Sequence, residues 1–564
     1  MTRSIIDPQM ARDRIPGEPA AGLRHGLRRF GPEDAATFWM IDYRNPEGFT
    51  PLGLVHLELA YCKASELVAN EGFIPGSDGF AVRLLGPFCY TAERPMAAPA
   101  ERAGREERLR ACLAALPHSF GLEWQTKGRA LWAANRMWQA RDLTGLGKAA
   151  LALVLEEALD HALQVWTEHF RLMYPLLALQ SAFYGFADGL EISRAEVADL
   201  LSGRSSTVTG CDLGLADLAL RARAMAIAPL LDGPDWRQDL TAQGGLAAAW
   251  LRRFDDFLHH HGWRADVVGD PGQPSWAEDP ERPMHHIRAL MRQDAPLQKL
   301  ISLLAARDRR AATLSAVRAR LSTPERAEFD RALADMEAAN FVWWQEDHNP
   351  LIDLAALLPL RKLALAAAKA LRLSPPEDVF YLFADEPRAL LRGEDLPELQ
   401  NLIAARKAWQ ARWQDRRTAL PRHFGPVPDR VDDAIYSEIE GLSPGYLAAL
   451  RGEVADGPLH GTPACSGQAL GRARVVLTDR DLDLIQPGEI LVCEGSTPAW
   501  TPVFSRIAAC LSDQGGTLSH TAIIAREYGL PCIVALGHAT RHFRTGDLVR
   551  VDASKGTAER LETA

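Results

Sequence analysis

The sequence predicts a multidomain protein of class α + α/β, in which a large, mostly helical part precedes a compact domain of short strands. Three observations support this prediction. The chain has 564 residues and is 47% apolar, which is enough for roughly two to four domains with sizeable cores. From about residue 102 to 417, apolar residues recur at helical spacing. After Gly461, short β-rich runs recur instead.

Proline and glycine divide the chain into four segments. Residues 1–30 are polar and contain proline, which predicts a loose arm. Residues 31–420 form the helical part, with a mixed segment near its start in which Ala81–Leu85 is strand-like. Residues 421–460 are rich in Pro and Gly, as is typical of a linker with at most a short helix. Residues 461–564 have a suitable length for one small domain.

The same patterns place individual elements. Long Ala/Leu-rich runs such as Leu354–Leu373 predict helices. Helix breaks are expected near Gly145, Gly203–Ser206, Gly269–Gly272 and Ser374–Pro376. In the C-terminal segment, strands are expected at Ala473–Leu477, Ile490–Cys493, Ala508–Leu511, Cys532–Ala535 and Leu548–Val551.

Composition excludes several classes of protein. The net charge of −10 argues against a chain-wide nucleic-acid or anionic-membrane binder. The sequence has no run of 18 apolar residues without a charge, so no membrane span is predicted. Its first residues include no apolar stretch of the kind found in a signal peptide. The eight cysteines form no C-x-x-C pair, which argues against zinc ribbons and dithiol redox sites. We therefore expect reduced thiols, a cytoplasmic location and no metal site in this chain.

The most informative stretch surrounds His520. Two glycines, Gly515 and Gly516, allow a tight turn after a strand. Ser519 is a good helix N-cap, and Gly529 is a good helix end. The spacing therefore predicts a helix from about residue 521 to 528, with His520 at its first turn.

Such a position suits an anion. Backbone N–H groups at a helix start favour phosphate, so Gly515, Gly516, Ser519 and Thr521 are predicted to form a phosphate loop. Histidine is available in its neutral, nucleophilic form near pH 7, so His520 is able to accept a phosphoryl group. A capping or core histidine is the alternative interpretation of the same spacing.

The run from Gly515 to Pro531 resembles the phosphohistidine signature of the swivelling domain in phosphoenolpyruvate-utilising enzymes. The similarity extends through Gly495–Phe504 upstream and Gly546–Asp552 downstream. The family includes pyruvate phosphate dikinase, phosphoenolpyruvate synthase, rifampin phosphotransferase and the phenylphosphate synthase catalytic subunit. The resemblance implies that His520 carries a phosphoryl group and that residues 461–564 form a β/β/α domain that swivels between two active sites.

Short patterns in the helical part are similar, in the same order, to the substrate domain of rifampin phosphotransferase and phenylphosphate synthase relatives. They are Phe38–Asp42 with Thr50–Leu52, Phe257–Arg264, Pro274–Pro280, Glu346–Asp353 and Asp378–Leu382. The resemblance implies that residues 31–420 bind the acceptor. Trp39, in the first pattern, is expected to contact it.

Phosphoryl transfer needs a base and cationic groups near the acceptor. His348, with Glu346 nearby, is predicted to be this base, and Asp353 to bind substrate. The alternative is a charged helix start, because Asn349-Pro350 resembles a boundary. His169 lies in an aromatic-rich helix and is a second candidate for the acceptor site, with a core histidine as the alternative.

Arg526 follows His520 by about one and a half helical turns and is predicted to stabilise the charge of the phosphoryl group. A surface ion pair, for example with Glu527, is the alternative.

We find neither the ATP-grasp domain with which full enzymes of this family begin nor the barrel with which the dikinases end. The layout is similar to the phenylphosphate synthase subunit and to the last two parts of rifampin phosphotransferase. We therefore expect a phosphotransferase that receives its phosphoryl group from ATP and Mg²⁺ through a separate ATP-grasp partner. The acceptor is expected to be a small hydroxylated molecule, with phenols as the first candidates. A non-catalytic phosphocarrier, or a fragment of a split phosphoenolpyruvate synthase or dikinase, remains an alternative.

Overall fold

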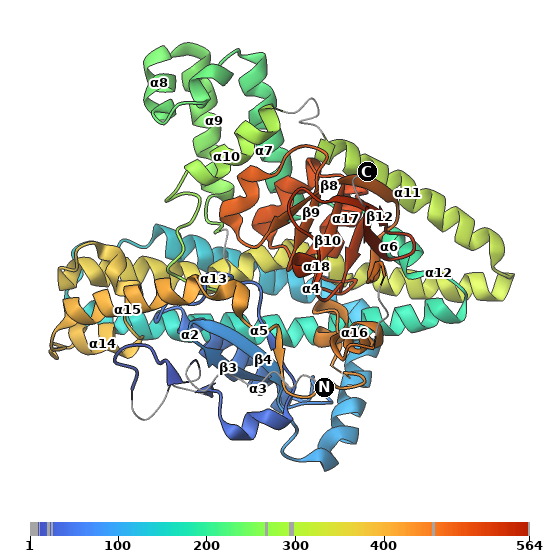
Figure 1. Ribbon diagram of the computed structural model, residues 1–564, viewed down its shortest axis with the longest axis horizontal. Coiled ribbons are helices and arrows are strands. Elements are labelled where there is room, and N and C mark those ends of the chain that lie inside the picture. The colour runs from blue at the N-terminus through green and yellow to red at the C-terminus, as the bar shows by residue number, and fades with distance from the viewer. Residues whose placement is uncertain are drawn as a thin grey trace.

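Two sheets organise the molecule, a five-stranded sheet within a helical body and an eight-stranded sheet in the C-terminal domain (Figure 1). The computed structural model describes the chain except residues 1–9, 11, 20–22, 24–25, 266–268, 293–297, 432, 454–456 and 562–564. It describes the backbone alone for residues 298–300, 302–303, 349–355, 479–480, 483 and 498–499. A large helical body followed by a β-rich domain confirms the predicted class, α + α/β.

Three long helices form the centre of the helical body. They are α4 (Arg102–Ala140), α5 (Lys148–Gly189) and α13 (Phe341–Leu371), and α13 packs along both of the others. The predicted break near Gly145 separates α4 from α5. The helix boundary suggested by Asn349-Pro350 is wrong, because α13 continues through this dipeptide and its apolar face packs on α5.

Shorter helices surround this centre. They are α2 (Leu54–His56), the π-helix η2 (Leu57–Ala64), α3 (Ser65–Asn70), α6 (Arg194–Leu201), α11 (Gln298–Arg320), α12 (Thr323–Ala338), α14 (Asp385–Leu391) and α15 (Leu399–Gln414). Single 3-10 turns lie at Pro32–Ala36, Pro99–Glu101, Ala228–Leu231, Pro376–Tyr381, Arg417–Ala419, Asp479–Leu484 and Pro498–Ser505.

Four helices form a lobe that projects from the helical body at the top of Figure 1. They are α7 (Thr207–Ala224), α8 (Trp236–Gln243), α9 (Gly245–His261) and α10 (Glu281–Met291). This lobe has its own core, in which aromatic rings of α8 and α9 pack on α7 and α10. The predicted breaks near residues 203–206 and 269–272 lie immediately before α7 and between α9 and α10.

The smaller sheet has the strand order β1-β3-β4-β2-β5. Its strands are β1 (Leu27–Arg29), β2 (Trp39–Ile41), β3 (Phe80–Leu85), β4 (Phe88–Glu93) and β5 (His423–Phe424). The strand β5 pairs with β2 at Trp39 opposite Phe424, so the chain returns to this sheet after all the long helices. The first residues of the segment predicted to be a linker therefore belong to the helical body.

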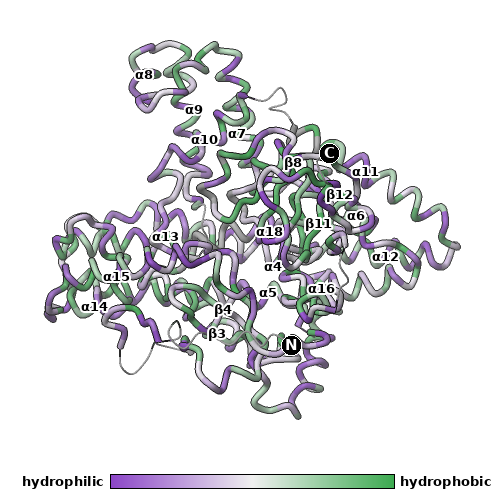
Figure 2. Tube along the Cα trace, in the orientation of Figure 1, coloured by the Kyte–Doolittle hydropathy of each residue, from purple (hydrophilic) through white to green (hydrophobic). Residues whose placement is uncertain are grey.

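The C-terminal sheet has the order β6-β13-β12-β8-β9-β10-β11-β7. Its strands are β6 (Leu459–His460), β7 (Thr462–Cys465), β8 (Gln468–Val476), β9 (Ile490–Cys493), β10 (Ala509–Ser512), β11 (Cys532–Val534), β12 (Leu548–Asp552) and β13 (Thr557–Arg560). Strands β8 to β11 are parallel neighbours, and β9, β10 and β11 are hydrophobic (Figure 2). These three strands are buried along their whole length, and helices α17 (His520–Tyr528) and α18 (Ala539–His542) pack on the sheet, whereas β8 is buried only at Ala473 and Val476.

The terminal arm and the linker are both packed more tightly than their composition indicates. In the described part of residues 1–30, Ile15 is buried and Asp13 accepts a hydrogen bond from Trp409. Residues 421–460 contain the π-helix η7 (Ile435–Ile439) and α16 (Pro444–Leu450), whose apolar side chains join the main core. This segment is ordered despite its Pro and Gly content, because the free energy gained by burying its apolar side chains exceeds the entropy cost of ordering its backbone.

All eight cysteines are free thiols in the structure. Among the described helices, none combines the length and the low charge that crossing a bilayer would require.

Candidate functional site

His520 is the first residue of α17, directly after the loop that leaves strand β10. The Ser519 side chain accepts a hydrogen bond from the Ala522 amide at 3.3 Å, which is the N-cap expected from the sequence. Gly529 ends the helix in the left-handed conformation at φ 62°. The local prediction of a strand, a glycine turn and a capped helix is therefore confirmed.

The backbone amides of the glycine loop have protein partners. Gly515 donates to the Glu440 carbonyl at 3.0 Å, Gly516 to the Ile439 carbonyl at 2.8 Å, and Leu518 to the Glu438 carbonyl at 3.0 Å. A Cβ on Gly516 would lie 2.2 Å from the Glu438 oxygen, so glycine permits this close approach. In this conformation the turn at residues 438–440 occupies the amides that the sequence assigned to phosphate.

Ser519 and Thr521, also predicted for the phosphate loop, are used within the domain. Ser519 caps α17, and the Thr521 hydroxyl accepts the Ser496 amide at 3.0 Å and contacts the Ser496 hydroxyl at 2.9 Å. These bonds hold residues 495–497 beside the start of α17.

The half-buried His520 side chain faces a cavity between the C-terminal domain and the helical body. Its Nε2 lies 3.4 Å from the Thr501 hydroxyl. The cavity has a volume of about 160 Å³, close to the ~150 Å³ of an apolar cavity that holds benzene. The lining residues are Asp42, Tyr43, Arg44, Phe49, His56, Tyr61, Phe80, Thr91, Trp166, His169, Phe170, Met173, Val208, Gln345, Glu346, Ile435, Tyr436, Ile439, Glu440, Ser496, Thr497, His520 and Ile523.

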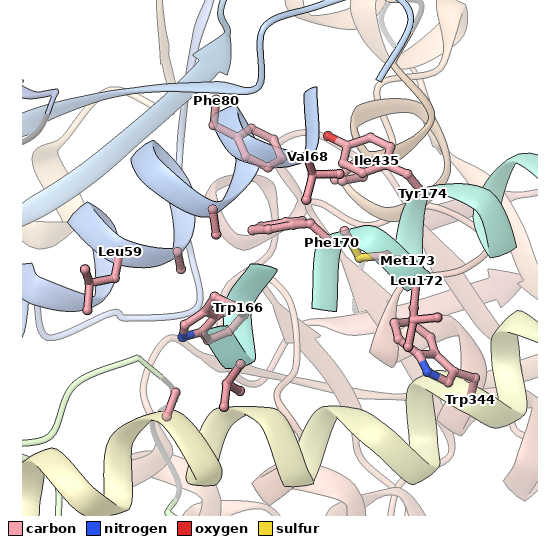
Figure 3. Close-up of a cluster of buried hydrophobic side chains, with 14 of the residues drawn as sticks. Leu59, Val68, Phe80, Trp166, Phe170, Leu172, Met173, Tyr174, Trp344 and Ile435 are labelled. Atoms are coloured by element: carbon pink, nitrogen blue, oxygen red, sulfur yellow. The ribbon is translucent and has the colours of Figure 1, made fainter. Parts of the chain in front are cut away.

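Aromatic and apolar side chains form most of the cavity wall. Figure 3 shows Phe80 beside Phe170, Met173 and Ile435, with Trp166 one turn earlier on α5. The rings of Phe80 and Phe170 lie 5.8 Å apart, centroid to centroid. Because these residues come from β3, α5 and η7, the wall exists only when distant parts of the chain pack together.

A charged group lies on the polar side of the cavity. Arg44 donates to Asp42 through Nε at 2.8 Å and through Nη2 at 3.1 Å, and its Nη2 lies 3.4 Å from the Glu440 carboxylate. The Tyr61 hydroxyl donates to the same Asp42 at 3.0 Å. Burial raises the pKa of Asp42, but Arg44 more than reverses this and leaves that pKa below its usual range. Burial raises the pKa of Glu440 despite the neighbouring Arg44.

Two buried histidines complete the wall. Burial, reinforced by the charge of Arg44, lowers the pKa of His56 to about 4 and that of His169 to about 3, although Asp42 opposes part of the shift at His56. Both rings are therefore neutral at pH 7. Among the described residues, the Nδ1 atoms of His56 and His169 have no hydrogen-bond partner, which leaves them available to a polar group of a ligand.

The structure separates the residues predicted for the acceptor site. Glu346 and His169 line the cavity, from α13 and α5 respectively. His348 does not, because it is fully buried with its ring stacked on Trp344 at 3.9 Å and on His169 at 5.2 Å. The side chain of Asp353 lies outside the described residues.

Trp39 and Arg526 also lie apart from the cavity lining. Trp39 is buried in the core beside the smaller sheet, where its indole N–H donates to the Asp34 carbonyl at 3.1 Å. Arg526 donates to the Thr517 carbonyl at 2.7 Å and to the Ala464 carbonyl at 3.3 Å. These bonds hold its guanidinium within its own domain, so neither the predicted charge role nor the ion pair with Glu527 is what the structure shows.

Sequence reasoning missed Asp42, Arg44, His56 and Glu440. A usable signal for the first two was the Phe38–Asp42 pattern, which contains Asp42 and ends two residues before Arg44. Glu440 lies in the segment interpreted as a linker, and no local pattern links it to Arg44.

A second contact between the C-terminal domain and the helical body consists of buried ion pairs. Arg422 pairs with Asp513 at 2.9 Å and also with Glu494, which Arg417 contacts as well. Glu494 and Asp513 directly follow the parallel strands β9 and β10. Asp513 also accepts hydrogen bonds from the Thr540 amide and hydroxyl. We call these four charged residues the clamp.

Two segments of the chain match known families. Residues 485–556, a segment that contains His520, match the family described as "PEP-utilising enzyme, mobile domain". Residues 171–346 match the family described as "Rifampicin phosphotransferase fourth domain", and this match runs from the C-terminal part of α5 through the projecting lobe to Glu346.

Curated relatives extend the similarity along the chain. Chondramide synthase of Chondromyces crocatus is 30% identical over 94% of this chain, which corresponds to 14% of that protein. The uncharacterised phosphotransferase YvkC of Bacillus subtilis is 28% identical over 70% of this chain and 47% of its own length. Rifampicin phosphotransferase of Streptomyces sviceus is 28% identical over 74% of this chain and 48% of its own length.

The chain therefore spans about half, or less, of the length of these relatives. The two domain matches nevertheless agree with each other, because both describe parts of the same group of enzymes. On this evidence residues 485–556 form a mobile domain of the PEP-utilising enzyme type, and residues 171–346 are similar to the fourth domain of rifampicin phosphotransferase.

Proposed function

We propose that this chain is a phosphotransferase in which His520 carries a phosphoryl group and passes it to a hydroxyl of a small aromatic acceptor. The observation behind this proposal is that His520 faces a cavity walled by the helical body. A carrier that only signals to another protein has no need of such a cavity beside its histidine. The cavity therefore favours the transferase over the phosphocarrier.

The transfer step exchanges one bond to phosphorus for another. The acceptor oxygen forms a P–O bond while the P–N bond of the phosphohistidine breaks, and its electron pair returns to the imidazole. The hydroxyl proton passes to the Glu346 carboxylate and then to the released imidazole nitrogen, so charge and protons balance. Glu346 is assigned this role because it lines the cavity, whereas His348 does not.

The shape and chemistry of the cavity support a small, largely apolar acceptor. Its volume of about 160 Å³ is suited to a single substituted ring. Aromatic side chains bind such a ring through offset or edge-to-face contacts. The neutral His56 and His169 are placed to hydrogen-bond a polar substituent. A simple phenol satisfies all of these requirements, as the phenylphosphate synthase-like interpretation expects.

Loading of His520 requires a second site. We propose that a separate ATP-grasp subunit, using ATP and Mg²⁺, phosphorylates His520 with consumption of one water molecule and release of AMP and phosphate. To reach that subunit, the loop at residues 515–518 must leave the carbonyls of residues 438–440, which frees its amides for phosphate. Among the described residues, no group of three or more His, Cys, Asp or Glu is arranged to hold a metal ion.

The experiment that tests this function is intact-mass measurement after incubation with ATP, Mg²⁺ and a candidate ATP-grasp partner. The wild type is expected to gain one acid-labile phosphoryl group, and His520→Ala to gain none. His538→Ala, an exposed histidine of the same domain, is the matched control and should be phosphorylated normally. Adding phenol should then discharge the wild type and produce phenyl phosphate. A wild type that stays unmodified with an active partner would contradict the proposal.

A further inference from the structure

We propose that Arg44 is a catalytic residue, the cation that binds the phosphoryl oxygens during transfer from His520 to the acceptor. The inference rests on the proposed function. It starts from a property of the cavity: among the described residues that line it, Arg44 is the only lysine or arginine. A transferring phosphoryl group spreads negative charge over its oxygens, and enzymes stabilise this charge with fixed cations.

The guanidinium of Arg44 is held in a defined orientation. Asp42 accepts hydrogen bonds from Nε and Nη2 of Arg44 and also from the Arg44 main-chain amide, the last at 2.9 Å. These bonds fix both the backbone and the side chain of Arg44. The Tyr61 hydroxyl donates to Asp42 Oδ2 at 3.0 Å, the oxygen that also accepts Arg44 Nη2. Such bidentate pairing gives geometric precision as well as charge. A preorganised cation needs little rearrangement when the phosphoryl group arrives.

One edge of the guanidinium remains available. Among the described residues, the Nη1 atom of Arg44 has no hydrogen-bond partner, while Nε and Nη2 face carboxylates. The side chain is 36% exposed, and it opens onto the cavity. A planar guanidinium with two free N–H bonds suits a phosphoryl oxygen better than the ammonium of lysine does. Burial lowers the pKa of Arg44, but Asp42, Tyr61 and Glu440 together more than offset this effect and raise that pKa above its usual value, so Arg44 remains a cation.

When the C-terminal domain is docked, Arg44 and the loop that precedes His520 both contact the turn at residues 438–440. The Glu440 side chain lies 3.4 Å from Arg44, and the carbonyl of the same residue accepts the Gly515 amide. Arg44 therefore shares a cavity with His520 only while the loop is docked on residues 438–440. It follows that Arg44 acts in the discharge of His520 and not in its loading by the partner subunit.

Arg526, which the sequence suggested for this role, is held by backbone carbonyls of its own domain. It travels with His520, whereas Arg44 stays with the acceptor. A cation on the acceptor side favours transfer at that site and nowhere else along the path of the domain.

The test separates loading from discharge. Wild type, Arg44→Ala and Arg44→Lys are loaded with ATP, Mg²⁺ and the ATP-grasp partner, and the loaded protein is then mixed with phenol. We expect equal loading, and discharge slower by about 100-fold or more in Arg44→Ala. Millimolar guanidinium chloride should restore part of the lost rate, which a merely structural role would not allow. Arg171→Ala, which breaks an ion pair with Glu71 away from the cavity, is the matched control.

A binding measurement keeps the inference falsifiable if Arg44→Ala does not fold. Phenyl phosphate is titrated calorimetrically into the unloaded wild type and into Arg44→Lys, and we expect at least tenfold weaker binding to the variant. Discharge of Arg44→Ala within threefold of the wild type, or equal binding of phenyl phosphate, would overturn the role of Arg44. Absence of loading in the wild type would instead overturn the proposed function on which it rests.

Discussion

Around His520 the C-terminal domain meets the helical body across a cavity of about 160 Å³ walled by aromatic rings, whereas at the clamp it meets the body through buried ion pairs. The clamp residues are nearly inaccessible, with side-chain exposures of 9% for Arg422 and 0% for Asp513. The cavity provides space for a ligand, whereas the clamp contains buried charges that are paired only when the two parts are in contact.

This difference indicates how a domain that we propose to move between two sites can still dock accurately. Apolar contact around the cavity is non-directional and tolerates small shifts. Buried charges tolerate none, because an unpaired one is strongly unfavourable. Ion pairs between charged groups are also readily replaced by water once the interface opens. We therefore expect the clamp to determine the docked position and the cavity wall to determine what binds there.

The largest effect is expected from breaking the clamp. Arg422→Ala removes the partner of Asp513 and one of the two partners of Glu494. Leaving such carboxylates buried is expected to destabilise the docked state by about 3–5 kcal/mol. The measurement is hydrogen exchange of the Gly516 amide, whose bond to Ile439 exists only in the docked state.

The control for this experiment is Arg550→Ala, which removes a surface ion pair with Glu559 in the same domain. It should leave exchange at Gly516 unchanged, because exposed pairs contribute little. Unaltered exchange in Arg422→Ala would show that the clamp does not hold the domain.

The next largest effect is expected on the pH dependence of stability, and it arises from His56 in the cavity wall. His56 has a pKa of about 4 in the folded protein and about 6.5 when unfolded. Below pH 6.5 the unfolded chain binds the proton that the folded protein refuses, so stability falls as pH decreases from 6.5 towards 4. A difference of about 2.5 pH units corresponds to about 3 kcal/mol.

Urea unfolding at pH 7 and at pH 4 measures this effect. In His56→Gln the loss of stability on acidification should be smaller by about 3 kcal/mol than in the wild type. His538→Gln, which changes an exposed histidine, should lose as much stability on acidification as the wild type does. Equal pH dependence in all three proteins would mean that His56 does not titrate as its burial requires.

A smaller effect is expected where the His520 loop meets the turn at residues 438–440. A Cβ at position 516 would lie 2.2 Å from the Glu438 carbonyl oxygen. Gly516→Ala should therefore destabilise docking by about 1–3 kcal/mol, as overpacking does elsewhere. Hydrogen exchange of the Leu518 amide checks this expectation. Gly445→Ala, where a Cβ meets no atom within 4 Å, should behave as the wild type.

The smallest effect is expected at the edge of the same contact. Arg194 pairs with Glu438 at 3.1 Å, with side-chain exposures of 46% and 14%. Because the pair is largely solvated, Arg194→Ala should change docking by less than about 1 kcal/mol. Exchange of the Gly516 amide in parallel with Arg422→Ala measures the ratio of the two effects. A larger loss at Arg194 than at Arg422 would reverse the comparison between the two contacts.

Part of the fold and of the site could be predicted because it depends on neighbours in sequence. Ser519, His520 and Gly529 specify the start and end of α17 through capping and backbone freedom, and the structure has that helix. The strands β9 to β12 follow short β-rich runs for the same local reason.

Elsewhere a distant segment competes with the local pattern. Composition alone made residues 421–460 a linker, yet Ile435 and Tyr436 are buried in the main core. Helix starts favour anions, yet the Gly515 and Gly516 amides donate to carbonyls of that same segment. Arg526 is near His520 in sequence, but its hydrogen bonds turn it elsewhere.

By itself the sequence determined the class of the fold, the family of the C-terminal domain and the position of His520 at a helix start, because spacing, capping and turn chemistry act over a few residues. Only the tertiary structure decided that Asp42, Arg44 and Glu440 share one cavity with His520, and that Arg417 and Arg422 pair with Glu494 and Asp513. The reason is physical: a cavity and a buried ion pair exist only where segments distant in sequence pack together, and their burial gives these charges their energetic weight.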